Sequence, residues 1–301
     1  MKTRIALLFL LAWAAGRAGA LDTVIYPGLA AAEAPLFFPP PRPGAYYDRF
    51  RDIKEMLQVA LEKTRPQYGP YELKESRLSM TEARSLEELR RGDTVSVVWS
   101  STSRQKETEF LPLRIDLRKG YLGYRICLIR KDFQARARAI RSLEQLRQVR
   151  VGQGIGWGDI AIYRHAGVPV IASGYGSLFT MLAQDRIDLF PRGVTEVFGE
   201  YDAVAPQLGN LAVEDSLLIE YAPFPYYLFF NRKHKRLAQR IETGLRLMQK
   251  DGSFDRIFWK YNRSSIERAR LDKRTVIRLH NPLLWADGTP PAPPPSQTPA
   301  R

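Results

Sequence analysis

The sequence contains very few of the residues that form disulfides and metal sites. Among 301 residues, Cys127 is the single cysteine, and there are three histidines, His165, His234 and His280. One cysteine cannot close an intramolecular disulfide, and the histidines lack the spacing and the cysteine partners of a zinc site. We therefore expect neither a disulfide nor a metal. Cys127 lies in the apolar stretch YRICLIR, and we interpret it as a small buried side chain in preference to a reactive thiol.

Motifs of common enzyme classes are also missing. No G-x-S-x-G nucleophile turn occurs, and the acidic residues are scattered over polar stretches. The glycine-rich stretch GQGIGWGD, residues 152–159, follows an apolar run but does not contain the G-x-G-x-x-G fingerprint of dinucleotide-binding proteins. We expect no cofactor and no catalytic activity.

Long apolar runs are absent beyond the N-terminus. Residues 5–15 are apolar, Lys2 and Arg4 precede them, and the small residues Ala18, Gly19 and Ala20 follow. This pattern is typical of a cleavable signal peptide, and the run is too short to span a bilayer. We expect residues 1–20 to be removed and the mature chain to be exported. Cys127 is too far from the cleavage site to carry a lipid anchor.

Negative charge is in the minority. The formal net charge is +14, and without Lys2, Arg4 and Arg17 the 46 basic residues become 43 against 32 acidic ones, a net charge of +11. Such an excess favours anionic partners, from small ligands to lipid headgroups and cell-surface polymers. Most of these arginines can equally form solvated faces that serve solubility. Export and the lack of a basic repeat argue against nucleic acid.

Strand and helix patterns alternate along the chain, which predicts helices packed on parallel sheets. Two such units predict two lobes with a ligand cleft between them. Ser85, Ser142 and Ser177 are expected to cap helices, and the proline-rich tail from residue 288 is expected to be disordered. The predicted strands cover residues 21–26, 71–78, 94–99, 122–129, 149–151, 168–172, 187–190 and 226–230, and the helices 47–63, 85–91, 159–165, 178–183, 235–250 and 254–261.

Four stretches in order give the chain a family resemblance: LRRGDTVSVVWSSTSRQKETEF, SLEQLRQVRVGQGIG, LFTMLAQDRIDLF and LMQKDGSFDRIFWKY. Together they resemble the type II periplasmic solute-binding proteins, in particular the branch that binds polar amino acids for ABC transporters. The resemblance covers residues 21–262. It rests on the order and spacing of these motifs, because each one alone is weak.

The resemblance implies an α/β fold of two lobes, each a mostly parallel sheet flanked by helices, joined by two hinge strands. Lobe 1 would comprise residues 21–124 plus 224–285, and lobe 2 residues 125–223, with 286–301 as a tail. It further implies a periplasmic, monomeric solute-binding protein that closes around a small anionic or amino-acid-like ligand for an ABC permease or a membrane sensor.

In lobe 1, the resemblance places Arg104 on the family's ligand-binding arginine. A guanidinium presents a planar fork of donors that matches a carboxylate. We expect Arg104 to bind a ligand carboxylate with the Ser101 hydroxyl and the Thr102 backbone, although composition alone favours an exposed arginine in a polar loop. Tyr26, at the end of the first strand, is expected to line the cleft or to be part of the core.

In lobe 2, the glycine-rich stretch falls on a family loop whose amides meet the same carboxylate. Gly154, Ile155, Gly156 and Trp157 are therefore expected at the ligand, with Trp157 either a cleft wall or a packing residue. We expect Asp159 to cap the following helix.

The stretch RIDLFPRG departs from the family pattern. The position that carries a carboxylate for the ligand ammonium is Gly193 here, and Arg192 stands beside it. We therefore expect a ligand more anionic than an ordinary α-amino acid, or one whose cation is met by Glu196 or Glu200. Arg192 can also belong to an exposed turn.

A second function remains open. The protein could keep this fold but act as a periplasmic interaction protein or sensor partner, binding an anionic envelope component through its basic surface. Salt separates the two functions, because surface charge pairs are screened much more than a desolvated cleft.

Overall fold

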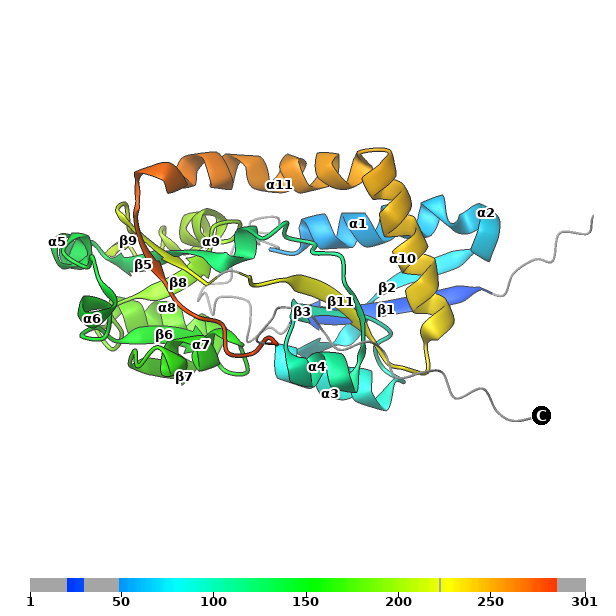
Figure 1. The fold of residues 1–301 in the computed structure, drawn as a ribbon, viewed down its shortest axis with the longest axis horizontal. Coiled ribbons are helices and arrows are strands. Elements are labelled where there is room, and N and C mark those ends of the chain that lie inside the picture. The colour runs from blue at the N-terminus through cyan, green and yellow to red at the C-terminus, as the bar shows by residue number, and fades with distance from the viewer. Residues whose placement is uncertain (1–20, 30–48, 222, 286–301) are drawn as a thin grey trace, which may run out of the picture.

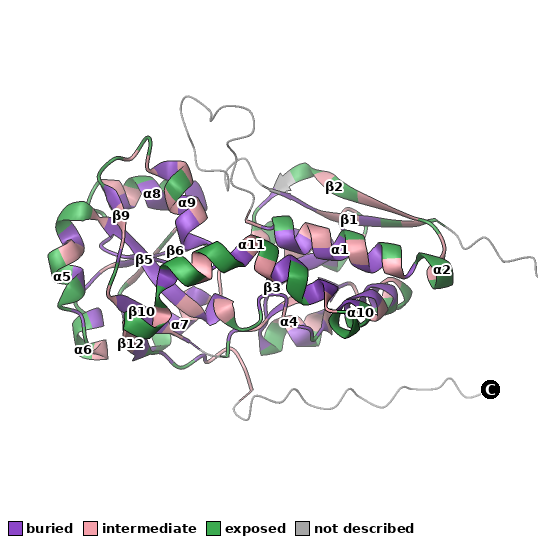
Figure 2. Cartoon of the chain, turned by 90° about the horizontal axis from the view of Figure 1, so that it is seen from above, coloured by how far each residue is buried: buried purple, intermediate pink, exposed green. Residues whose placement is uncertain are grey.

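The computed structural model describes residues 21–29, 49–221 and 223–285, and its strands and helices form two lobes side by side (Figure 1). The predicted signal peptide and the tail from residue 286 lie outside the described residues. The helix α11 (Ser253–Ala269) lies across both lobes, as the view from above shows (Figure 2).

Lobe 1 is built on parallel pairing of its first two strands, while β3 and β4 pair antiparallel with a returning strand, β11. Its elements are β1 (Asp22–Leu29), α1 (Arg51–Lys63), α2 (Arg65–Tyr68), β2 (Tyr71–Met80), α3 (Glu82–Arg91), β3 (Val98–Ser101), α4 (Arg104–Glu109), β4 (Leu111–Leu113), β11 (Tyr226–Phe230) and α10 (Lys235–Lys250).

Lobe 2 is built around β5, which pairs antiparallel with β8, β9 and β10, while β6 and β7 pair parallel. Its elements are β5 (Tyr124–Arg130), α5 (Gln134–Arg138), α6 (Leu143–Leu146), β6 (Val151–Gly154), α7 (Asp159–His165), β7 (Val170–Ser173), α8 (Tyr175–Ala183), β8 (Phe190–Gly193), α9 (Val197–Val204), β9 (Leu211–Val213) and β10 (Leu217–Glu220). The two-lobed α/β fold agrees with the prediction, but strand pairing is more mixed than the mostly parallel sheets expected.

The chain joins the lobes more than twice. It crosses between β4 and β5, again between β10 and β11, and a third time through α11. After α11, β12 (Thr275–Arg278) pairs parallel with β10 of lobe 2, although the predicted boundary assigns it to lobe 1. The chain then returns to lobe 1, where the Leu283 carbonyl accepts the Arg104 amide at 2.9 Å.

Apolar periodicity explains the packing of α1. Its buried side chains recur at helical spacing, and α10 approaches it so closely at Gly244 that a Cβ there would collide with the Ala60 backbone.

The start of α3 corrects the prediction at Ser85. The helix begins earlier because the Thr81 side chain accepts the Arg84 amide, and Ser85 donates to the Thr81 carbonyl from inside the helix. Gly174, not Ser177, precedes α8, whereas the Ser142 cap of α6 is confirmed.

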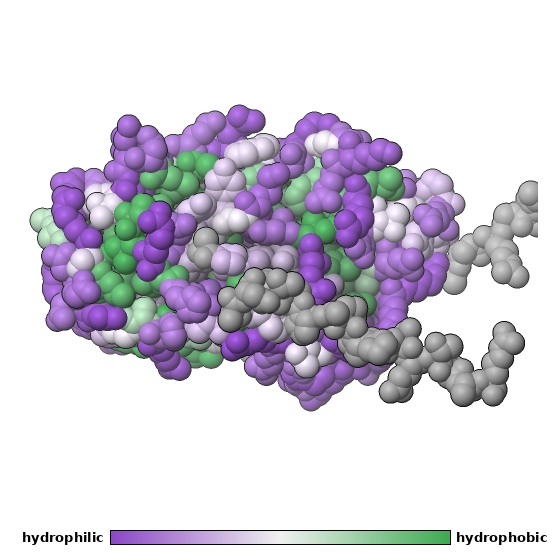
Figure 3. All heavy atoms as spheres, in the orientation of Figure 1, coloured by the Kyte–Doolittle hydropathy of each residue, from purple (hydrophilic) through white to green (hydrophobic). Residues whose placement is uncertain are grey.

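Apolar side chains fill the interior of both lobes, and Cys127 is fully buried among them, as predicted. Hydrophilic side chains dominate the surface seen in the first view (Figure 3). None of the described helices is long and apolar enough to cross a membrane.

Candidate functional site

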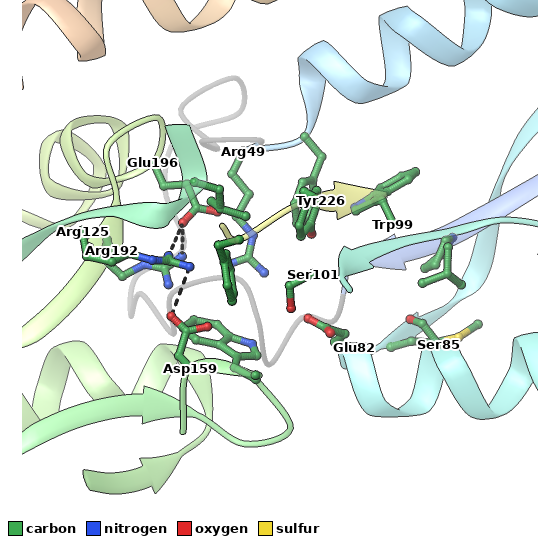
Figure 4. Close-up of a pocket in the computed structure, with 18 of the residues that line it drawn as sticks. Arg49, Glu82, Ser85, Trp99, Ser101, Arg125, Asp159, Arg192, Glu196 and Tyr226 are labelled. Carbon is green, nitrogen blue, oxygen red and sulfur yellow. Dashed lines mark ion pairs between the residues drawn. The ribbon is translucent and has the colours of Figure 1, made fainter. Parts of the chain in front are cut away.

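A pocket of about 70 Å³ lies where the two lobes face each other (Figure 4). Lobe 1 contributes the end of β1, the two residues before α1, and parts of α3, β3 and β11. Lobe 2 contributes β5, the loop after β6, the end of β8 and the residue before α9. The side chains that matter below are Arg49, Glu82, Trp99, Ser101, Arg125, Trp157, Asp159, Arg192, Glu196 and Tyr226.

Six charged side chains of alternating sign form a continuous row along the lobe 2 side of this pocket. In order they are Asp159, Arg125, Glu196, Arg192, Glu200 and Arg49, and the successive nitrogen–oxygen distances are 3.1, 3.8, 3.0, 2.6 and 3.9 Å. We call this set the charge row. All six side chains are at least nine-tenths buried. The row contains three carboxylates and three guanidiniums, so its formal charges cancel.

Arg192 is the best-paired member of the charge row. Its Nε and Nη2 donate to the two oxygens of Glu200 at 2.6 and 2.8 Å, a bidentate geometry. Its Cζ also lies 4.5 Å from the ring centre of Trp157. Burial works against the charged guanidinium, but Glu196 and Glu200 outweigh it and raise the pKa of Arg192.

Glu196 lies between two guanidiniums. Burial alone would raise its pKa, but the positive charges of Arg192, Arg49 and Arg125 outweigh this and lower the pKa of Glu196 to about 2. The carboxylate is therefore ionised at neutral pH, and it also accepts the Gly193 amide at 3.3 Å.

The lobe 1 side of the pocket is more lightly charged. Glu82 accepts Lys106 Nζ at 3.0 Å and the Ser100 hydroxyl at 2.5 Å. Within the described part of the chain, the side-chain hydroxyls of Ser101 and Tyr226 form no hydrogen bond, and both residues line the pocket. They are polar groups that a bound molecule can use.

Of the predicted site residues, Ser101, Trp157 and Arg192 line the pocket. Arg104 lies outside it. Its side chain is exposed, and Nη2 donates to the Pro282 carbonyl at 3.2 Å. Thr102 is buried, but its amide donates to the Pro225 carbonyl and its hydroxyl to Glu107.

The glycine loop lies differently from the expectation, whereas Tyr26 takes the second of its two expected places, against the core. The Ile155 amide donates to the Ser173 carbonyl and the Trp157 amide to the Gly154 carbonyl, so two loop amides are already used within lobe 2. Ile155 is 63% exposed, and the Trp157 indole covers Gly154 in the space of a missing side chain. Gly156 adopts a positive φ of 86°, which suits a glycine. Tyr26 packs beside Trp99, with ring centres 5.7 Å apart, and is not a lining residue.

Asp159 does not cap α7, which corrects the prediction. It is the first residue of the helix and makes no side-chain cap hydrogen bond. Its carboxylate instead accepts the Tyr221 hydroxyl and pairs with Arg125.

Arg125 itself was missed, because a single arginine in an apolar strand pattern carries no local signal of a charged partner. Among the described residues, no histidine, cysteine or carboxylate group is arranged to hold a metal ion.

Neither protein-family models nor curated proteins match the sequence. Solved structures do match. An ancestral arginine-binding protein bound to arginine is 19% identical, with a TM-score of 0.57 over 80% of this chain and 98% of that chain. A periplasmic binding protein of Salmonella typhimurium with high arginine specificity is 16% identical, with a TM-score of 0.55 over 80% and 99%.

A third similar structure is an ancestral amino acid-binding protein, a precursor of cyclohexadienyl dehydratase. It is 16% identical, with a TM-score of 0.54 over 80% of this chain and 95% of that chain. At these identities the likeness concerns the fold. This chain therefore has the two-lobed fold of the type II periplasmic solute-binding proteins.

Proposed function

We propose that the protein is a periplasmic solute-binding protein that captures a small, carboxylate-bearing, amino-acid-like ligand between its lobes. The observation that carries this proposal is the pocket at the junction of the lobes, which offers charged groups of both signs together with aromatic walls. An ABC importer or a membrane sensor would then read the closed form.

The charge balance of the pocket favours a zwitterion over a multiply charged anion. Each guanidinium of the charge row already has a carboxylate partner. A dianion would have to separate one of these buried pairs, which is costly because a carboxylate would lose its partner. A zwitterion can meet Glu82 with its ammonium and a guanidinium edge with its carboxylate, and it adds no net charge.

We propose Ser101, Tyr226, Trp157 and Arg125 as direct ligand contacts. Ser101 and Tyr226 supply hydroxyls from lobe 1, Trp157 supplies an aromatic wall, and Arg125 has a buried Nε without a hydrogen-bond partner in the described structure. Arg104 remains a proposed contact for an opened form, since it would first have to leave the Pro282 carbonyl.

The proposal is tested by a thermal-shift screen of residues 21–301 against amino acids, keto acids, dicarboxylates and small phosphorylated acids. A ligand at a hundredfold excess over its dissociation constant stabilises the folded protein by about 2.7 kcal/mol, which is a shift of several degrees. A shift with a zwitterionic compound supports the proposal. If no compound shifts the transition while the protein binds an anionic polymer in a salt-sensitive way, the interaction-protein function is favoured.

Two neighbouring tyrosines give a matched pair of variants. Tyr226→Phe removes a hydroxyl from the pocket, whereas Tyr227→Phe removes one from the adjacent residue of β11, which does not line it. We expect the first variant to weaken ligand binding by about tenfold, the value of one hydrogen bond, and the second to leave it unchanged. Recovery of the ligand unaltered after prolonged incubation would support the absence of catalysis.

A further inference from the structure

The charge row ends in a residue from the opposite lobe. Arg49 directly precedes α1 in lobe 1, but its Nη1 lies 3.9 Å from Glu200 of α9 in lobe 2. Its guanidinium carbon lies 4.7 Å from the ring centre of Tyr175 and 5.8 Å from that of Trp157, both also in lobe 2. Figure 4 shows Arg49 extending into the pocket beside Arg192 and Glu196.

The backbone of Arg49 is held by a buried network in lobe 1. Its carbonyl accepts Arg118 Nη2 at 2.7 Å, and Arg118 Nη1 donates to Asp52 at 2.6 Å. Asn262 donates to the same Asp52 oxygen at 3.1 Å. The adjacent Phe50 packs on Trp99, with ring centres 5.4 Å apart. The side chain therefore projects across the pocket from a fixed base.

Without Arg49, the charge row has an excess of negative charge. The remaining members are three carboxylates and two guanidiniums, all in lobe 2 and all at least nine-tenths buried. A buried net charge is unfavourable unless it is paired, so lobe 2 requires a cation at the Glu200 end of the row.

The surroundings of that cation favour a guanidinium over an ammonium. Tyr175 is buried and Trp157 lines the pocket, and their rings lie beside the Arg49 guanidinium. A planar, weakly hydrated guanidinium stacks on aromatic rings and pairs with a carboxylate at its edge, which a compact, strongly hydrated ammonium does less well.

Trp157, Tyr175 and Glu200 hold the guanidinium of Arg192 from within lobe 2. We infer that the same three residues form a second guanidinium-binding site that faces lobe 1, and that Arg49 is its tethered occupant. The site goes beyond the proposed solute pocket, because its ligand belongs to the chain itself. Arg49 contributes to holding the lobes together, and a free guanidinium compound is excluded while Arg49 is in place.

Chemical rescue tests this inference. Arg49→Ala removes the occupant, and Arg51→Ala, two residues further along the chain, is the matched control. The probe is ethylguanidinium at millimolar concentration, compared with sodium chloride at equal ionic strength. We expect Arg49→Ala to melt below the wild type, and ethylguanidinium to raise its melting temperature by a few degrees. The wild type and Arg51→Ala should show no such rise.

An equal response of Arg49→Ala and Arg51→Ala to ethylguanidinium, or no response in either, would overturn the inference. If Arg49→Ala does not fold, Arg49→Gln retains the length of the side chain without its charge and undergoes the same comparison. Because ethylguanidinium has no carboxylate, its effect is independent of whether the pocket binds an amino-acid-like solute. The two proposals can therefore fail separately.

Discussion

The carboxylate of Glu196 lies against Gly193, because its Oε2 accepts the Gly193 amide at 3.3 Å. A Cβ added to Gly193 would lie 2.7 Å from Leu122 Cδ1 and 3.1 Å from Glu196 Oε2, so a side chain here would meet both residues. The family resemblance expects a carboxylate at position 193, and in this chain a residue three positions later brings one to the same place. The loss of an acidic side chain at Gly193 therefore does not leave the pocket without negative charge.

The lowered pKa of Glu196 predicts a loss of stability in acid. Its pKa is about 2 in the folded protein and about 4.5 when unperturbed, so its stabilising effect is complete above pH 4.5 and is lost as the pH falls towards 2. We expect Glu196→Gln to be less stable than the wild type by about 3 kcal/mol at neutral pH, with the difference shrinking between pH 4.5 and 2. Urea unfolding at several pH values measures it. Glu242→Gln, on the exposed face of α10, should show no such convergence.

The bidentate pair of Arg192 and Glu200 predicts a large effect of removing one charge. Glu200→Gln leaves the buried guanidinium with a weaker partner, and we expect a loss of about 3 kcal/mol in the free energy of unfolding. Glu267→Gln removes an exposed partner of Arg263 and should cost under about 1 kcal/mol. Equal losses in the two variants would contradict the importance of burial in the charge row.

The close approach of α1 and α10 predicts a cost of adding one carbon atom. A Cβ on Gly244 would collide with the Ala60 backbone, which cannot move aside as a side-chain end can. We expect Gly244→Ala to lower stability by about 1–3 kcal/mol in urea unfolding. Gly209 has nothing within 4 Å of such a carbon, so Gly209→Ala should leave stability unchanged or slightly raised.

The return of the C-terminal segment to lobe 1 depends on Asn281. This buried side chain donates to the Pro223 carbonyl at 3.0 Å and accepts the Leu283 amide at 3.1 Å. We expect Asn281→Ala to cost about 1–3 kcal/mol in thermal or urea unfolding, because it leaves buried polar groups unpaired. Asn210, whose side chain makes a single exposed bond to Ala183, provides the control, and its alanine variant should lose less.

Elements with strong local signals were predictable from the sequence. The bounds of α7, β11 and α10 are confirmed, because apolar patterns define all three and Gly167 and Gly252 follow the two helices. The helix expected to end at residue 261 continues to Ala269. This continuation was not predicted, because the polar stretch after residue 261 has few apolar residues. What stabilises that stretch is contact with lobe 2, where Ala269 is fully buried. β12 was also missed, although Thr275, Val276 and Ile277 are β-branched residues typical of a strand.

The charge row as a whole was not predictable, because most of its links join residues that are far apart in the sequence, although Arg192, Glu196 and Glu200 lie close together. Arg125 and Asp159 are 34 positions apart, and Arg49 reaches Glu200 from the other lobe. Sequence alone suggested that Arg192 would meet a ligand as an unpaired cation. The fold instead brings the carboxylates of Glu196 and Glu200 to Arg192. The net charge of a site can therefore be judged only once its ion pairs are known.

Calorimetric titration at low and high salt tests most directly whether the pocket binds an amino-acid-like zwitterion. We expect one amino acid to bind residues 21–301 with an affinity that changes little with salt and falls in Tyr226→Phe, while the corresponding dicarboxylate without an ammonium binds more weakly. Tighter binding of the dicarboxylate, or binding that disappears at high salt and is unaffected by Tyr226→Phe, would contradict it.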